Sequence, residues 1–137
     1  MLFYQLGIYA QNIARQVIAL DPELVSQEFE EDVAVAEQGV GKEVDFLVRG
    51  AQTVKQLFLE VKYSLPRAPG AALTRLVAQV NNAVATGRGQ VVLWSLQQPG
   101  LQQVRLTYQA IGNNAAVVQF VSGVEGLYRY FQLYFGE

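Results

Sequence analysis

Two strand-like segments that set charged residues into apolar sequence constrain the fold of this chain most strongly. They are residues 43–48 and 57–62, and a short glycine-containing stretch separates them. Side chains of a strand alternate between its two faces, so Glu60 and Lys62 share one face while Val61 points to the other. The pattern predicts a β-hairpin with an apolar side and a charged side.

The turn between these segments predicts how their residues oppose one another. If the connection is symmetric about residues 52 and 53, Asp45 stands directly across from Glu60. Opposed Cβ atoms lie about 4.5–5.5 Å apart, where like charges are destabilising. A divalent cation would compensate that repulsion, and a slip of one residue would separate the acids. The alternation also predicts three apolar residues together on the opposite face: Val44, Phe46 and Val48. The alternative interpretation of Glu60 and Lys62 is a solvated ion-pair face.

The composition narrows the chemistry that such a site could perform. The chain has no Cys and no His, which excludes disulfides, thiol nucleophiles, imidazole-bound zinc and a serine–histidine triad. An enzyme built from this sequence would rely on carboxylates, Lys, Tyr or a bound metal. Oxygen ligands favour a hard cation such as magnesium or manganese.

Periodicity along the rest of the chain predicts one domain over residues 1–137. The expected elements are a helix at 3–20, a helical turn at 22–29, strands near 31–37, 42–49 and 55–63, a helix at 69–86, a strand at 90–96, a helix near 99–111, a strand near 115–121 and a helix near 123–135. This order predicts an α/β (α+β) fold, with a mixed β-sheet that has an antiparallel start and a parallel finish and is flanked by helices. No apolar run approaches the roughly eighteen residues of a membrane span.

Two of the helices show which side should be buried. In the first, the residues near helical spacing are Leu6, Ile13, Val17 and Leu20. In the helix at 69–86, we expect an apolar side of Leu73, Val77, Val80 and Val84 opposite a polar side of Arg75, Gln79, Asn82 and Thr86. Gly87 stands where a C-terminal cap is expected.

The order of elements and the Asp…Glu-x-Lys constellation resemble the PD-(D/E)xK nuclease superfamily. The resemblance covers roughly residues 3–96 and implies a restriction-endonuclease-like fold. It implies that Asp45, Glu60 and Lys62 are catalytic. In such enzymes the two acids and the backbone carbonyl of Val61 would bind magnesium or manganese, and Lys62 would position the attacking water. Asp45 follows Val44 where the family pattern has Pro.

Further residues have candidate roles by the same resemblance. Gln79 lies where some members carry a substrate-orienting Gln, and Arg75, one turn earlier, could meet a phosphate; an ordinary polar helix face is the alternative. Many members place a Glu on the first helix, where this chain offers Gln11 and Gln5; for Gln11 we favour a structural role. Other acids that could replace it are Glu28, Glu30 and Glu31, which we interpret as a solvated edge.

A looser resemblance concerns residues 60–66 (Glu-Val-Lys-Tyr-Ser-Leu-Pro), 73–76 (Leu-Thr-Arg-Leu) and 91–96 (Val-Val-Leu-Trp-Ser-Leu). They are similar to the C-terminal nuclease domains of contact-dependent growth-inhibition and other polymorphic toxins. This resemblance implies an endonuclease (tRNase or DNase) delivered as part of a larger secreted toxin, acting in the cytoplasm, and blocked by an immunity protein. The alternatives are a resolvase-like housekeeping nuclease and an inactive nuclease-fold binding module.

The charged side chains are unevenly distributed along the chain. Residues 1–60 carry ten of the twelve acidic side chains, and residues 61–137 carry six of the ten basic ones. This division favours an acidic metal pocket beside a basic surface.

The last helix is crowded by Leu127, Tyr128, Tyr130, Phe131, Leu133, Tyr134 and Phe135, which are too many for one face. We expect core packing and a protein interface there.

Overall fold

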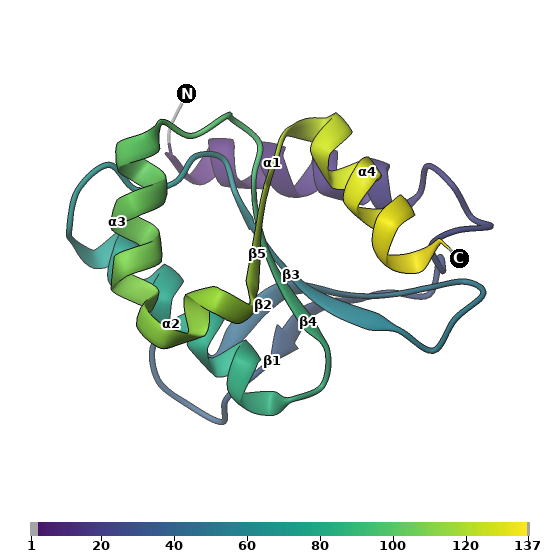
Figure 1. Cartoon of the computed structure of the whole chain (residues 1–137), viewed down its shortest axis with the longest axis horizontal. Helices are drawn as coiled ribbons and strands as arrows, with labels where there is room; N and C mark the ends of the chain where they lie inside the picture. Colours follow the sequence, from purple (N-terminus) through teal and green to yellow (C-terminus); the bar gives the residue numbers. More distant parts are fainter. Residues whose placement is uncertain (1–2, 137) are drawn as a thin grey trace.

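The predicted hairpin lies within a five-stranded sheet in the computed structural model, which describes residues 3–136 (Figure 1). The helices are α1 (Phe3–Ile18), α2 (Ala71–Thr86), α3 (Leu101–Ile111) and α4 (Gly123–Phe135), and a 3-10 helix, η1 (Gly112–Val117), follows α3. The strands are β1 (Glu30–Ala34), β2 (Glu43–Arg49), β3 (Gln56–Lys62), β4 (Gln90–Ser95) and β5 (Val118–Ser122).

The strands lie side by side in chain order, β1-β2-β3-β4-β5. β1, β2 and β3 pair antiparallel, whereas β4 runs parallel to β3, and β5 runs parallel to β4. A parallel pair needs a long crossover, and α2 provides it between β3 and β4. The predicted α/β fold, a mixed sheet with an antiparallel start and a parallel finish, is therefore confirmed.

Helices cover both faces of the sheet and create two apolar cores (Figure 1). The first core joins one face to α1 and α4, and its sheet residues are Phe46, Val48, Leu57, Leu59, Val61, Val92 and Trp94. The second joins the other face to α2 and α3, and its sheet residues are Val33, Val44, Leu47, Phe58, Val91, Leu93 and Val118. Of the helices in residues 3–136, none is both long and apolar enough to cross a membrane.

Two alanines lie at the centre of the buried side of α1, together with the predicted Val17. The fully buried positions of this helix are Ala10, Ala14, Val17 and Ile18. Of the four residues expected to be buried, Val17 is buried, Leu6 and Ile13 are half-buried, and Leu20 is 62% exposed. Two alanines one turn apart let a helix lie close to a sheet, which brings the neighbouring polar residues of α1 near the strands.

Two predicted elements are wrong in detail. The helical turn at 22–29 stops after one turn, because Val25 bridges to Gly50 and the amide of Ser26 donates to the carbonyl of Arg49. The last strand begins at Val118 instead of about residue 115. Before it, η1 lies against α2, where the side chain of Asn114 donates to that of Asn81 at 2.9 Å.

The buried side of α2 is rotated relative to the prediction. Its buried residues are Leu73, Leu76, Gln79, Val80 and Ala83. Val77 and Val84 are only half-buried, so the polar Gln79 faces the sheet in their place. Gly87 caps the helix as predicted, with φ 64° and its amide donating to the carbonyl of Val84 at 3.1 Å.

The aromatic residues of α4 are accommodated mainly by packing. Leu127, Phe131 and Phe135 are buried in the first core, and three tyrosines of the helix pack against that core. The hydroxyl of Tyr134 donates to the carbonyl of Gln56 at 3.1 Å. Leu133 is the exception, with 75% of its surface exposed. The expected core packing is therefore confirmed.

The turn between β1 and β2 packs against α2 at Gly41. This glycine is buried and has φ +72°, and a Cβ at this position would lie 2.5 Å from the backbone nitrogen of Gln79. The side chain of Asn82 donates to the carbonyl of Gly41 at 2.9 Å. Only glycine satisfies both the left-handed backbone and the close approach to a helix.

We predict that Gly41→Ala destabilises the protein more than Gly39→Ala does. Both positions have positive φ, so each substitution should cost roughly 1–2 kcal/mol of unfolding free energy. Gly39 has open space around it, whereas the alanine at position 41 would also clash with α2, at an additional ~1–3 kcal/mol. Urea unfolding measures both. Equal losses would show that the contact with α2 does not restrict this turn.

Candidate functional site

The carboxylates of Asp45 and Glu60 lie side by side on β2 and β3, as the predicted register requires. The ladder between these strands pairs Phe46 with Leu59, and continuing it by one residue places Asp45 across from Glu60. The backbone amide of Asp45 donates to Oε1 of Glu60 at 3.2 Å, and the amide of Val61 donates to Oδ2 of Asp45 at 2.8 Å. Each acid is thus held by the backbone of the opposite strand.

The strand β2 is distorted at Asp45, which was not predicted. Val44 packs in the second core instead of joining Phe46 in the first, so the strict alternation of faces is broken between them. On the other side, Asp32 of β1 occupies the position across from Asp45 and has φ +51°, which is uncommon outside glycine. The Asp45 carboxylate accepts the Val61 amide hydrogen bond at the point where the ladder between β2 and β3 stops.

Lys62 completes the cluster from the same face of β3. Its Nζ lies 3.0 Å from Oε2 of Glu60 and donates to Oε1 of Gln79 at 3.1 Å. Gln79, which is only 6% exposed, donates its own amide to the carbonyl of Glu43 at 3.2 Å. The structure therefore brings the predicted Gln79 next to Lys62, where it orients the ammonium group.

Gln11 of α1 also belongs to the site, although we favoured a structural role for it. Its Nε2 donates to Oδ1 of Asp45 at 2.8 Å. The neighbouring alanines could have identified Gln11 as a site residue. Ala10 and Ala14 are buried, and Gln11 stands at the edge of the face that they form. Gln5, the other candidate on this helix, is exposed and does not line the cleft around the acids.

The acidic stretch before the hairpin lies outside the site. Glu31 pairs with Arg15 at 2.7 Å, and Glu30 pairs with Arg49. These two acids and Glu28 are exposed and do not line the cleft. They form a solvated edge, as the sequence indicated. On the first helix, Gln11 and not Gln5 is the residue that contacts Asp45.

A cleft of about 1060 Å³ surrounds the cluster. α1 contributes Gln11 and four other residues to its wall, the segment after β3 contributes Arg67, and α2 contributes Arg75 and Gln79. Arg75 and Arg67 are exposed, so two guanidinium groups border a cleft that has two acids and Lys62 at its floor. The structure thus brings the predicted Arg75 to the same cleft.

Burial dominates the electrostatics of the two acids. It raises the pKa of Glu60 to about 8 against the opposing effect of the Lys62 ammonium, and the Asp45 carboxylate raises it further. Burial also raises the pKa of Asp45, and the hydrogen bond from the Val61 amide opposes this rise. The two carboxylates share a single ammonium, so a bound cation would stabilise their ionised forms and lower both pKa values.

The residues of the cluster fit a magnesium or manganese ion. Asp45 and Glu60 offer two carboxylates, and the backbone of Val61 borders the cleft while its side chain lies in the first core. Within residues 3–136 no group of three or more acidic side chains is placed so that it could hold a metal ion. Magnesium often binds to proteins through one or two carboxylates together with waters and substrate phosphates, so this donor set is sufficient.

Comparison of the chain with protein families, with curated proteins and with solved structures found no match.

We predict that the metal-free protein becomes less stable as the pH rises from about 5 to about 8. Glu60 keeps its proton up to a pKa of about 8 in the folded state but loses it near the ordinary value of 4.5 when unfolded. The folded state therefore binds more protons in this window, and its stability falls with rising pH. Urea unfolding at several pH values measures the slope.

Glu60→Gln provides the control because it cannot titrate at this position. We expect the stability of wild type relative to Glu60→Gln to decrease across the same window. A difference between the two proteins that stays constant with pH would contradict the raised pKa of Glu60.

Proposed function

We propose that this chain is a metal-dependent nuclease of the PD-(D/E)xK type, which hydrolyses phosphodiester bonds in nucleic acid. The observation that carries this proposal is the meeting of Asp45, Glu60 and Lys62 at the floor of one cleft. The buried carboxylate of Glu60 beside the half-buried carboxylate of Asp45 is costly for a fold, and binding a cation would offset that cost. The helix and strand order of the resemblance is also present in the fold.

Asp45, Glu60 and the carbonyl of Val61 would hold the metal ion. A bound magnesium or manganese ion would lower the pKa of a water molecule and neutralise charge on the scissile phosphate. Gln11 keeps the Asp45 carboxylate in position through its hydrogen bond to Oδ1. The Val61 amide holds the other carboxylate oxygen, so the orientation of Asp45 is set before any ligand enters.

Lys62 would act on the attacking water and on the phosphate. An ammonium group has three N–H donors, and the contacts with Glu60 and Gln79 account for two of them. The third can meet a water molecule or a phosphate oxygen in the cleft. Since Lys62 is held from two sides, its charge lies in a fixed place where negative charge develops in the reaction.

Groups at the rim of the cleft support nucleic acid as the substrate. Arg67 and Arg75 are suited to phosphates along a strand. Tyr4, which is 78% exposed, and Tyr63 line the same cleft, and aromatic rings there can stack on bases.

We predict cleavage of at least one nucleic acid by the purified protein in the presence of magnesium. The substrates are total tRNA, plasmid DNA and single-stranded DNA, each incubated with magnesium or with EDTA. Glu60→Gln, Asp45→Asn and Lys62→Ala should each lower the rate by about 10²-fold or more, because each removes a group of the reaction centre. Gel electrophoresis and end-labelled fragments measure the rate.

Glu31→Gln is a matched control, because it alters an exposed acid outside the cleft. It should cleave like the wild-type protein. If wild type and Glu60→Gln behave alike on every substrate, the catalytic assignment is wrong.

Further measurements separate the related functions. A resolvase-like enzyme would cut branched DNA selectively, and a binding module would show neither metal binding nor cleavage. A toxin domain would arrest growth when expressed in the cytoplasm, and Lys62→Ala would relieve the arrest. Co-expression of a cognate immunity protein would also relieve it.

A further inference from the structure

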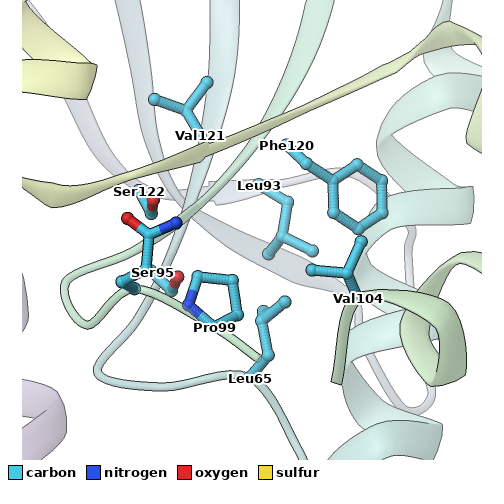
Figure 2. Close-up of a pocket in the computed structure, with 9 residues that line it drawn as sticks. Leu65, Leu93, Ser95, Pro99, Val104, Phe120, Val121 and Ser122 are labelled. Atoms are coloured by element: carbon cyan, nitrogen blue, oxygen red, sulfur yellow. The ribbon is translucent and has the colours of Figure 1, made fainter. Parts of the chain in front are cut away.

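A second, smaller hollow lies beside the candidate active site on the same face of the sheet. Its volume is about 250 Å³, and its walls come from β4, β5, the start of α3 and the segments before them (Figure 2). Leu65 lines both this hollow and the large cleft, so the two are neighbours. The residues that line it had no predicted role.

The register of the parallel strands places the hollow relative to the catalytic groups. Glu60 pairs with Leu93, which pairs with Phe120. Two residues further along the strands, Lys62 pairs with Ser95, which pairs with Ser122. Adjacent strands are about 4.8 Å apart, so the backbone of Ser122, on the β5 side of the hollow, lies two strand spacings, about 10 Å, from that of Lys62.

The hollow has apolar walls and a polar end. Figure 2 shows the ring of Phe120 and the side chains of Leu93, Val104 and Leu65 around the opening, with the hydroxyls of Ser95 and Ser122 on one side. Gln98 adds an amide to the lining. A flat molecule with an apolar surface and a polar edge fits such a lining. Since pockets for drug-sized ligands measure about 300–1,000 Å³, this one suits a single ring system.

Two hydroxyls at the polar end have capacity for a ligand. Ser122 stands at the N-cap of α4, where serine commonly caps the helix, yet its side chain makes no capping hydrogen bond. Ser95, which is 2% exposed, donates its Oγ hydrogen to the carbonyl of Gln97 at 2.8 Å and keeps its acceptor positions. A ligand with both donors and acceptors on one edge could therefore be held here.

We propose that this hollow binds one nucleobase of the substrate, close to the phosphodiester that is cut. The proposal rests on the proposed nuclease function, because only then does a phosphate lie at Lys62. A base extruded from its strand would contact Phe120 and Val104 and present its polar edge to Ser95 and Ser122, a mode that proteins use to recognise unstacked bases. The hollow thereby selects which base stands next to the cut.

The first experiment measures base binding without cleavage. The Glu60→Gln protein is titrated with adenosine, guanosine, cytidine and uridine and followed by amide NMR. Nucleosides have no phosphate, so the cleft around Lys62 does not attract them through charge. We expect saturable shifts at Ser95, Phe120 and Ser122 with at least one nucleoside. The absence of such shifts with all four would overturn the proposal.

Variants of the hollow make the result specific. In the Glu60→Gln background, Val104→Phe fills the space and should weaken nucleoside binding by at least about tenfold. Ser122→Ala should weaken it about fivefold without changing the unfolding midpoint, because this hydroxyl does not cap α4. Val117→Phe is the control for Val104→Phe, since Val117 is 54% exposed and lies outside both hollows. Equal binding by the Val104 and Val117 variants would overturn the proposal.

The second experiment maps cleavage sites on an RNA and a DNA of mixed sequence. We expect the wild-type protein to favour one base next to the cut, and Val104→Phe in the wild-type background to reduce this preference at least tenfold while it still cleaves. An active enzyme with no base preference would overturn the base pocket but leave the nuclease intact. Nucleoside binding by a wild-type protein that cleaves nothing would instead reject the nuclease and the placement beside a cut.

Discussion

The hydrogen bond from the backbone amide of Val61 to the carboxylate of Asp45 holds the candidate site together. It uses a main-chain donor of β3 at the point where the ladder between β2 and β3 ends. In return, the amide of Asp45 donates to Glu60, so the two acids are fixed by the strands and not by flexible side chains alone. The distorted end of β2 is therefore part of the architecture of the site.

This arrangement places a strongly polar cluster against the apolar interior, and the surroundings determine its properties. The pKa of Glu60 is raised to about 8 because the side chain is buried, while Lys62 provides one compensating positive charge. Gln79 holds Lys62 from α2, and the turn at Gly41 packs against that helix next to Gln79. Three segments far apart in the sequence thus contribute to the position of a single ammonium group.

Much of the fold could be predicted because it depends on local patterns. The alternation in β2 and β3 and a short connection were enough to predict the pairing of Asp45 with Glu60, since register follows from the turn. The face of Val44 could not be predicted, because it depends on the distortion of β2 at Asp45, which interrupts the alternation. The role of Gln11 was also missed, because it requires knowing how closely α1 approaches the sheet, and Ala10 and Ala14 decide that distance.

The parallel half of the sheet separates the parts of the molecule that maintain the fold from those that meet a ligand. β3, β4 and β5 all end at one edge, and the connecting segments that follow β3 and β4 supply Leu65, Arg67 and Pro99 to the two hollows. Arg67 is exposed, so substitution there would leave both cores unchanged. Such a division lets mutation alter what is recognised at little cost to folding, and related chains could diverge in ligand preference while keeping the same reactive centre.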